Sequence, residues 1–491
     1  MKINDSHINQ AQKLFYESLD FQNVGNFIIA KEKLSKALKL YPGRESIINN
    51  IAIIYFNLED LFSLESLIKN QKITNSTLLN LISAYILYLK KHYKNCIEFC
   101  LKNLNINSNN YEQILDLLIK SYFKTKDIQN IFKFMRLSLR SNNFLEQKYY
   151  NIGLMLFHLG KPVPAIVYFD KAININKSSV YLNSKALALL KSKNFVEGLE
   201  LLENRFLNYP ENSILFKNIP QLDNLKGISN KKVVVWYEQG LGDTLNFARY
   251  VLLLKQYTKQ ITFIVQDPLI NILKNLDNQI VIKRFKEAEN EFFDYQIPLM
   301  SLIKKFDKSL ERPFESTIQL KQNSKKIDLE PNSLHIAFAH SGNQNYARDH
   351  YRSIDISKFK NIFKLENIYF YKLNKSNISV LDTNFNQSLR DFSNLDIYEI
   401  SILLSNFDLI ISTDTVFAHL CGILNINCIL LLSKNSDWRW FDDHKTTVWY
   451  KSIRILKQKK LDDWDAVIVL INRFLRLKSY TKKKMTEDRF H

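Results

Sequence analysis

Cysteine, glycine and proline are scarce in this chain of 491 residues, which contains four, ten and nine of them respectively. The cysteines Cys96, Cys100, Cys421 and Cys428 form no C-x-x-C pair and have no histidine at zinc-ligand spacing. This argues against a disulfide framework and a structural zinc site. We therefore expect reduced, buried thiols.

Long hydrophobic runs are also absent. The longest, such as VLLLKQY and CILLLS, fall well short of the ~20 residues that cross a bilayer. The first residues, MKINDSHINQ, lack the apolar core of a signal peptide. We therefore expect a cytoplasmic protein without a transmembrane segment. Because 46% of the residues are hydrophobic and 13% aromatic, the chain can fill the cores of globular domains rather than remain disordered.

Acidic residues are fewer than basic ones, 49 against 68, so the formal charge is +19 and the pI about 9.4. Such a charge favours binding to phosphates, nucleic acid or anionic membranes. The lysines are scattered along the chain, however, apart from the tail around RLKSYTKKK, and scattered lysines usually lie on a solvated surface. No basic-aromatic module appears, so we expect no nucleic-acid partner.

The first 210 residues contain an internal repeat. In YYNIGLMLFHLGKPVPAIVYFDKAININ, Gly153 is followed by Ala165, Phe169 and Ala172, which is the spacing of a tetratricopeptide (TPR) unit. Small residues there let two antiparallel helices approach closely, and the larger one fills the groove between them. The same frame recurs at three further places: Ala30, Leu34, Ala37 and Pro42; Ala84, Cys96 and Cys100; and Ala186, Gly198, Leu202 and Pro210. We expect an α-solenoid of about six repeats.

The second half has the pattern of an α/β protein. Short apolar runs alternate there with helical patterns, and they read KVVVWY, ITFIVQ, IVIKRF, HIAFAH, IYFYKL, DLIIS and CILLLS. Strands that are apolar on both faces belong in parallel sheets covered by helices. Two sets of strands, split near KQNSKKIDLEPNS, predict two Rossmann-like lobes. Ligands of such sheets bind at the carboxyl ends of the strands, so the turns there are the candidate sites.

The first candidate turn is WYEQGLGDTLNFARY, which reads as strand, loop and helix. Gly240 and Gly242 permit a positive φ and a close approach of the backbone to a ligand. Asp243 or Thr244 can cap the helix. A capped turn without further function remains the alternative, because the third glycine of a dinucleotide fingerprint and the lysine of a Walker motif are both missing.

The second candidate turn is DLIISTDTVFAHLCGIL. It places Ser412, Thr413, Asp414 and Thr415 at a helix start, with His419 one turn further on the same face. Free N–H groups, hydroxyls and the helix dipole suit such a start to a diphosphate. The alternative is a capping cluster above a core histidine.

The third candidate turn is SGNQNYARDHYRSIDISKF, which combines Ser341, Gly342 and Asn343 with Arg348 and Arg352. One of the two guanidinium groups could bind phosphate oxygens with two hydrogen bonds. Alternatively, both arginines lie on a solvated loop.

Four motifs in order, EQGLGDTLNFARY, HSGNQNYARDHYRSI, STDTVFAHLCGIL and DWRWFDDHKTTVWYKSIRILKQ, resemble the C-terminal domain of bacterial TPR glycosyltransferases. That domain is similar to glycosyltransferase family 9, the heptosyltransferase group, and the resemblance covers about residues 220 to 475. It implies an α plus α/β architecture, a TPR-like solenoid followed by a GT-B domain. The predicted domains are 1–215 for the repeats, 216–330 for the acceptor lobe, and 331–491 for the nucleotide-sugar lobe with a basic tail.

The resemblance also implies roles for residues. Asp243 stands at the family's candidate catalytic base, and Arg352 where the family has lysine or arginine. The expected donor-binding residues are Gly240, Gly242, Ser341, Gly342, Asn343, Arg352, Thr413, Asp414, Thr415 and His419. Arginine and a helix N-terminus can stabilise the leaving diphosphate, so no metal and no cofactor beyond the nucleotide-sugar substrate is expected.

This chain departs from the family pattern at two positions. His340 replaces the usual tryptophan before Ser-Gly-Asn, which could change what stacks in the pocket, and Asn425 replaces a glycine. The formal D-x-D within DDWD, the metal motif of the other large glycosyltransferase fold, precedes a helical pattern and is interpreted as helix capping. Trp438 in SDWRW is expected near the base or the sugar, as a packing or stacking surface.

The leading hypothesis is a metal-independent inverting glycosyltransferase whose solenoid binds the acceptor, a protein, on its concave face. A second hypothesis is a non-enzymatic TPR scaffold with a degenerate GT-B domain. A third is an envelope polysaccharide or lipopolysaccharide sugar transferase. The basic charge favours this hypothesis, but it assigns no function to the solenoid.

Overall fold

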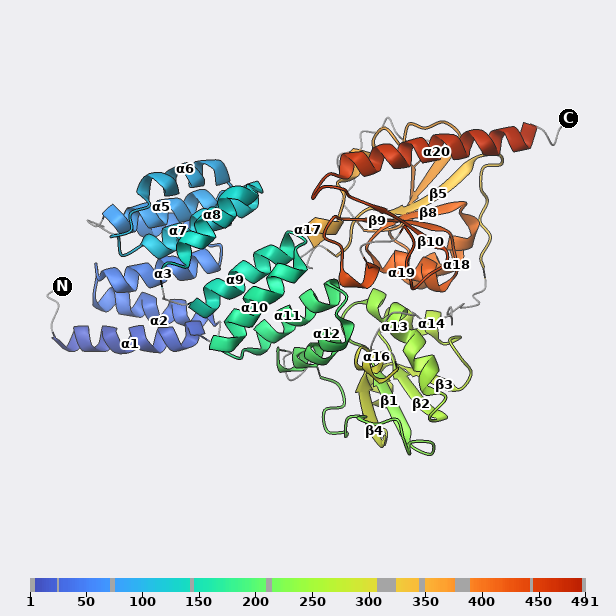
Figure 1. Cartoon of the computed structure of the whole chain (residues 1–491), viewed down its shortest axis with the longest axis horizontal. Coiled ribbons are helices and arrows are strands. Elements are labelled where there is room, and N and C mark those ends of the chain that lie inside the picture. Colours follow the sequence, from blue (N-terminus) through green and yellow to red (C-terminus); the bar gives the residue numbers. More distant parts are fainter. Residues whose placement is uncertain are drawn as a thin grey trace. The chain divides into compact units, whose positions relative to one another are not determined.

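The computed structural model describes residues 5–23, 26–70, 76–141, 145–208, 214–306, 324–343, 349–375, 389–441 and 445–487. The chain forms two compact units, Met1–Lys148 and Tyr149–His491. The first consists of helices, and the second combines helices with two parallel sheets (Figure 1).

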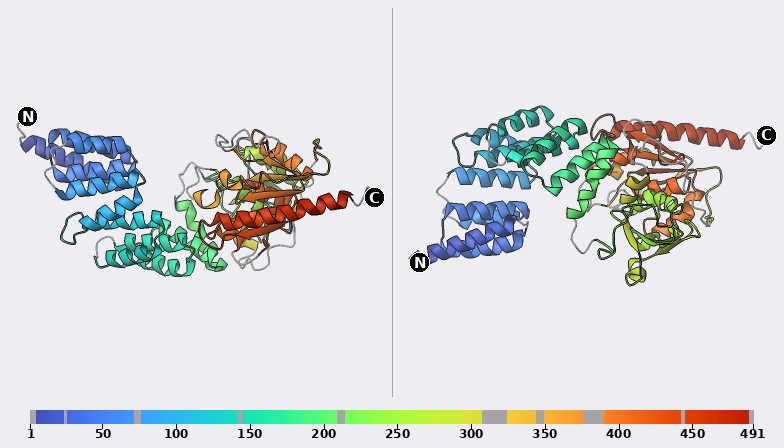
Figure 2. Two further views of the ribbon diagram at one scale, coloured as in Figure 1. Left: turned by 90° about the horizontal axis from the view of Figure 1, so that it is seen from above. Right: turned by 60° about the horizontal axis from the view of Figure 1, so that its bottom comes forward.

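The first unit is a run of helices that pack against their neighbours in the chain, as both views in Figure 2 show. Their small residues are buried at the predicted places, including Ala30, Ala37 and Ala84. Cys96 takes the place of an alanine, with its Sγ 3.3 Å from the carbonyl oxygen of Ala84. The helices are α1 (Asp5–Asn23), α2 (Phe27–Leu40), α3 (Glu45–Asn57), α4 (Leu61–Asn70), α5 (Ser76–Leu89), α6 (Tyr93–Asn103), α7 (Tyr111–Thr125) and α8 (Ile128–Ser138).

The repeat pattern continues into the second unit. A Cβ added at Gly153 would lie 2.6 Å from the ring of Phe169, and one at Gly198 would lie 2.9 Å from Leu190. Both glycines are therefore needed for close helix packing, as the repeat spacing predicts. Pro210, which would end the last repeat, lies outside the described residues. The elements are α9 (Leu145–His158), α10 (Pro162–Ile175), α11 (Ser179–Lys191), α12 (Phe195–Leu202) and the 3-10 helix η1 (Glu203–Asn208).

The first lobe is a four-stranded parallel sheet of order β3-β2-β1-β4. Val233 on the central β1 lies opposite Ile261 on β2 and Tyr295 on β4. The sequence pattern missed β4, which is short and ends in a proline. The elements are β1 (Lys232–Trp236), α13 (Leu241–Leu254), β2 (Gln260–Ile264), η3 (Asp267–Leu269), α14 (Ile270–Leu273), β3 (Ile280–Lys283), α15 (Phe285–Ala288), β4 (Tyr295–Pro298) and α16 (Ser301–Phe306).

The second lobe is a six-stranded parallel sheet of order β10-β9-β8-β5-β6-β7. Strands β7 and β10 are its edges and were also missed, because their half-polar sequences lack the apolar run of an inner strand. The elements are β5 (Leu334–Ala339), α17 (Asp349–Arg352), η4 (Ile356–Phe359), β6 (Ile368–Lys372), β7 (Leu389–Asp391), α18 (Ile397–Leu403), η6 (Leu404–Asn406), β8 (Leu409–Thr413), α19 (Val416–Ile423), β9 (Cys428–Leu432), η7 (Trp438–Trp440), β10 (Ile453–Lys457) and α20 (Trp464–Glu487).

The fold class predicted from the sequence is confirmed: a TPR-like array precedes the two Rossmann-like lobes of a GT-B arrangement. All four cysteines are buried free thiols. The end of the array is not separate from the lobes, because Leu190, Phe195 and Leu199 belong to one core cluster with residues of both sheets. The domain boundary at 215/216 stays a prediction.

Candidate functional site

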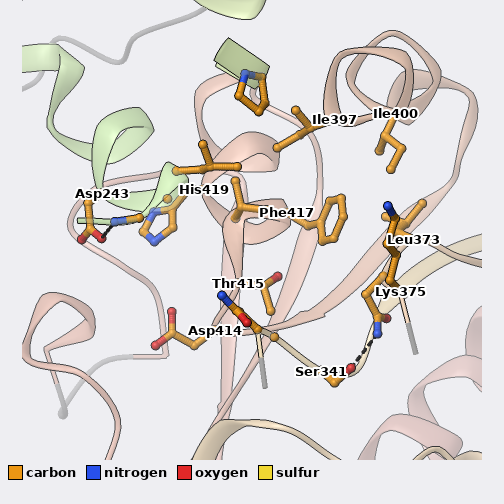
Figure 3. Close-up of a pocket in the computed structure, with 18 of the residues that line it drawn as sticks. Asp243, Ser341, Leu373, Lys375, Ile397, Ile400, Asp414, Thr415, Phe417 and His419 are labelled. Atoms are coloured by element: carbon orange, nitrogen blue, oxygen red, sulfur yellow. Dashed lines mark hydrogen bonds between the residues drawn. The ribbon is translucent and has the colours of Figure 1, made fainter. Parts of the chain in front are cut away.

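A cavity of about 1030 Å³ lies between the two lobes, at the carboxyl ends of their strands. Loops after β1, β2, β5, β6 and β8 line it, together with α18 and the segment before η7. All three candidate turns therefore meet at one place. In the close-up, Asp243, His419 and Asp414 lie toward one end, and Leu373, Ile397 and Ile400 lie toward the other (Figure 3).

The turn after β1 places Asp243 in the cavity by a route that the sequence did not predict. Gly240 has a φ of −86° and Gly242 is not in the left-handed region; Gln239 is the residue with a positive φ, of 57°. The expected positive φ at the two glycines was therefore wrong. Gly240 is the N-cap of α13, and Asp243 lies in its first turn, where Oδ2 accepts a 3.1 Å hydrogen bond from the N–H of Gly240.

Gly242 is required by a close approach across the two lobes. A Cβ at this position would lie 2.7 Å from Cδ2 of His419, which is on α19 in the second lobe. The sequence predicts a close approach of this backbone to a ligand; the close approach that the structure shows is to a side chain of the opposite lobe.

Asp243 is paired with an arginine that the sequence reasoning did not single out. Arg439 Nη2 lies 2.8 Å from Asp243 Oδ1 and donates a 2.8 Å hydrogen bond to Oε1 of Gln239. Its Nη1 donates to Oδ1 of Asp437, also over 2.8 Å. Since Arg439 is on η7 of the second lobe, this ion pair joins the lobes across the cavity. The only available signal was its place in the DWRW motif.

Burial raises the pKa of Asp243 above its ordinary value. The guanidinium of Arg439 opposes that rise, and the carboxylate of Asp437 adds to it. A partly buried carboxylate of raised pKa is a stronger base than a solvated one. The ion pair with Arg439 holds the carboxylate in one orientation.

The turn after β8 combines polar groups at the start of α19. Thr415 is the N-cap, and its Oγ1 lies 3.0 Å from Oγ of Ser412. Thr413 is fully buried and does not line the cavity, because its hydroxyl faces the carbonyl oxygen of Ala339 at 3.5 Å. Asp414 lines the cavity, and burial raises its pKa to about 6, with Asp437 adding to the rise and Arg352 opposing it.

His419 is a neutral imidazole with a defined tautomer. Burial and the positive charge of Arg439 lower its pKa to about 3. The hydroxyl of Tyr450 donates to Oδ1 of Asn246 over 3.0 Å, so its oxygen accepts from Nδ1–H of His419, also over 3.0 Å. Nε2 therefore carries a lone pair, and the ring stacks on Trp440 with centroids 4.8 Å apart.

The Ser-Gly-Asn turn and the side chain of Arg352 pack directly against each other. A Cβ at Gly342 would lie 2.4 Å from Nη2 of Arg352, so only glycine lets the guanidinium lie against the turn. Arg352 donates from Nη1 to the carbonyl oxygen of Asp414 and from Nε to Asp349, each over 2.8 Å. The arginine thus joins the second and third candidate turns. The other candidate, Arg348, lies outside the described residues.

His340 does not line the cavity, so the expectation that it changes what stacks there was wrong. It is buried, and its Nδ1 lies 2.7 Å from the carbonyl oxygen of Ile354. Burial lowers its pKa, so the ring is neutral and Nδ1–H donates to that carbonyl. Trp438 does not line the cavity either, but it is a packing surface near Asp243, because it stacks on Phe247 and its ring centroid lies 5.0 Å from the guanidinium of Arg439.

Two polar cavity residues after β6 were missed. Asn374 donates a 2.6 Å hydrogen bond to Oγ of Ser341 and accepts one from the N–H of His340. The exposed Lys375 follows it. The sequence feature that could have indicated these two residues is the strand pattern IYFYKL, which ends directly before Asn374. The predicted residues Gly240, Gly242, Asp243, Ser341, Gly342, Asn343, Arg352, Asp414, Thr415 and His419 all line the cavity.

No protein-family model matches the chain, and no curated protein matches it either. Among solved structures, the ADP-heptose LPS heptosyltransferase II of E. coli is 12% identical, covers 51% of this chain and 99% of its own, and has a TM-score of 0.34. The iron-containing dodecameric glycosyltransferase TibC of enterotoxigenic E. coli is 13% identical, with coverage of 52% and 76% and a TM-score of 0.36.

The TPR protein PilF of Pseudomonas aeruginosa is 16% identical, covers 42% of this chain and 95% of its own, and has a TM-score of 0.31. Both kinds of structure that the sequence resemblance predicted are thus among the similar ones. Within the described ranges, no helix is long and apolar enough to span a bilayer, and no cluster of potential metal ligands occurs.

Proposed function

We propose that this protein is a GT-B glycosyltransferase that transfers a sugar from a nucleotide-sugar to an acceptor hydroxyl with inversion and without a metal. The observation that supports this most is one cavity between two Rossmann-like lobes, with the carboxylate of Asp243 from one lobe facing the helix start of α19 and Arg352 from the other.

The donor would bind along the second lobe. Arg352, the N–H groups at the start of α19 and Lys375 offer positive charge and hydrogen-bond donors for a diphosphate. The apolar end of the cavity, with Leu373, Phe417, Ile397 and Ile400, suits the flat face of a nucleobase (Figure 3). Because His419 is neutral, it would contribute a hydrogen-bond acceptor at Nε2 to a sugar hydroxyl rather than charge to the diphosphate.

The reaction follows from this placement. The acceptor oxygen forms a bond to the anomeric carbon while the bond from that carbon to the phosphate oxygen breaks, and the nucleoside diphosphate leaves with the electron pair. Asp243 takes the proton of the acceptor hydroxyl. Arg352 and the start of α19 stabilise the negative charge that develops on the leaving group, so these groups do the work that a metal does elsewhere.

The acceptor that we propose is a protein bound by the concave face of the TPR-like array, in a cytoplasmic setting. TPR-like arrays commonly present extended concave binding surfaces, which supports a macromolecular acceptor. An envelope polysaccharide or lipopolysaccharide acceptor is the enzymatic alternative. A non-enzymatic scaffold is the other alternative, and the polar groups gathered in the cavity argue against it.

A thermal-shift screen with ADP-, GDP- and UDP-sugars tests the donor. A sugar nucleotide at ~100 times its Kd should stabilise the protein by about 2.7 kcal/mol. Asp243→Asn should keep this shift and lose hydrolysis or transfer of the bound donor. If no nucleotide-sugar or nucleoside diphosphate shifts the transition of the intact chain, the scaffold alternative replaces the enzyme.

A further inference from the structure

Both partners of the Asp243–Arg439 ion pair lie on short segments that the end of the helical-repeat array contacts. Arg439 is in the segment 433–441, which follows β9 and contains η7. Asp243 follows Glu238 and Gln239, which connect β1 to α13. We propose that the repeats from α9 to η1 are a positioning element of the active site, which holds Arg439 against Asp243. This inference rests on the proposed function of Asp243.

The segment 433–441 of the second lobe is held by the ends of two repeat helices. Asn435 Nδ2 donates to the carbonyl oxygens of Phe157 and His158, over 3.1 and 3.0 Å, at the C-terminal end of α9. The carbonyl oxygen of Phe157 also accepts a hydrogen bond from the N–H of Gly160 over 3.0 Å, so the amide of Asn435 is a second donor there. Lys191, the last residue of α11, donates from Nζ to the carbonyl oxygen of Ser436 over 2.5 Å.

Asn435 and Ser436, which these contacts hold, lie just before Asp437 and Arg439 in the sequence, and the latter two residues line the cavity. Asp437 follows Ser436, and its carboxylate accepts from Nη1 of Arg439. Phe441, at the end of the segment, has a φ of 47°, and its ring contacts Phe195 of α12 edge-on at 5.4 Å. The segment is thus fixed at both ends by the array, and the guanidinium of Arg439 projects from between these fixed points.

The loop of the first lobe that precedes Asp243 is held by a buried ion pair. Arg205 of η1 is 2% exposed, and it donates to both carboxylate oxygens of Glu238, from Nε over 2.7 Å and from Nη2 over 2.9 Å. Oε1 of Glu238 also accepts from the N–H of Met300 over 2.9 Å. Glu238 precedes Gln239, whose side chain accepts from Arg439. The array therefore fixes the loop of Asp243 as well.

Substitutions at these contacts distinguish a positioning role of the array from a purely local structural role. Neither Lys191 nor Asn435 lines the large cavity, but Asn435 lines a small pocket together with Arg352 and Asp414, so Lys191 is the better position for a substitution. If they position Arg439, their loss should change the environment of Asp243 at a distance. A purely structural contact would change only its own neighbourhood.

The test compares two lysines of the same helix by hydrogen exchange of the full chain without ligand. Lys191→Met removes the contact with Ser436, and Lys191→Arg retains a donor there. Lys185→Met is the matched control, because Lys185 pairs with Asp170 and Glu197 within the array, over 2.9 and 2.8 Å. We expect Lys191→Met to accelerate exchange about tenfold in 433–441 and also in 239–250, as for one lost charged hydrogen bond.

Lys191→Arg should restore both segments, and Lys185→Met should alter neither. Unchanged exchange in 239–250 with faster exchange in 433–441, or equal effects of both Met variants, would overturn the proposal. The exchange measurement uses no substrate, so its result does not depend on whether the protein transfers a sugar. With a donor in hand, Lys191→Met should lower kcat about tenfold at unchanged donor KM. Lys191→Met should also move the acid limb of the pH–rate profile to higher pH. Arg439 lowers the pKa of Asp243, so a displaced Arg439 lets that pKa rise.

Discussion

The same repeat pattern is used differently in the two units of this chain. Helices α1 to α8 bury small residues such as Ala30, Ala84 and Cys96 against helices of their own unit. Helices α11 and α12 carry the same pattern, but Leu190 and Leu199 join a core that includes strands of both lobes. Small-residue spacing therefore predicts that two helices pair, and leaves open what else the pair covers.

The largest effect expected from this difference concerns truncation. A fragment of residues 149–491 should fold, whereas a fragment of residues 216–491, cut at the predicted domain boundary, should not fold stably. The shorter fragment loses Arg205, and an unpaired buried Glu238 costs about 3–5 kcal/mol, in addition to the exposed core. Circular dichroism during heating of the two fragments measures this. Equal melting temperatures would mean that α9 to η1 belong with the repeats alone.

Replacing one carboxylate in each unit sharpens the comparison. Asp243→Asn and Asp127→Asn both keep a side chain that can form a helix-capping hydrogen bond, in α13 and α8 respectively. Only Asp243→Asn removes the proposed base, so it should lower transfer by about 10²–10⁴-fold at nearly unchanged melting temperature. Asp127→Asn should leave transfer unchanged. Normal transfer by Asp243→Asn, measured with a purified acceptor, would remove this residue from the mechanism.

Donor binding should distinguish cavity arginines from surface ones. Arg352→Ala should weaken nucleotide-sugar binding by about 1.5–3 kcal/mol in calorimetry, because it removes a charged donor from the cavity. Arg136→Ala, on an exposed position of α8, is the control in the first unit and should bind normally. Thr413→Ala should also bind normally, since its side chain is buried outside the cavity. Weak binding by Thr413→Ala alone would place the diphosphate deeper, toward β8.

The pH dependence of stability should have opposite signs at two aspartates. Burial raises the pKa of Asp414 to about 6, so the folded state binds its proton more tightly than the unfolded state. Its contribution to stability is therefore present at low pH and is lost as pH rises through about 6. Hydrogen bonds from Asn130 lower the pKa of Asp127, so its contribution is present above its unfolded pKa and is lost as pH falls.

Urea unfolding at a series of pH values measures both signs. The free energy of unfolding of the wild type minus that of Asp414→Asn should fall between about pH 4 and 6.5, and the corresponding difference for Asp127→Asn should rise or stay level. A rising difference for Asp414→Asn would mean that its carboxylate is stabilised as an anion in the folded cavity.

The sequence by itself determined the features that depend on local order along the chain. The spacing of Gly153, Ala165 and Phe169 predicts close helix pairs, and apolar β-branched runs predict the inner strands. Three polar turns at strand ends predict where ligands bind, since parallel strands place their carboxyl ends at one edge. The edge strands β4, β7 and β10 were missed because short or half-polar segments carry little periodic signal.

Only the tertiary structure decided which groups meet. Arg439 lies 200 positions from Gln239, and no local pattern indicates that its guanidinium reaches Gln239 and Asp243. The need for Gly242 also comes from a side chain of the other lobe, His419, rather than from a positive φ. Such contacts depend on how the sheets and repeat helices pack together, and packing brings together residues whose positions in the sequence are unrelated.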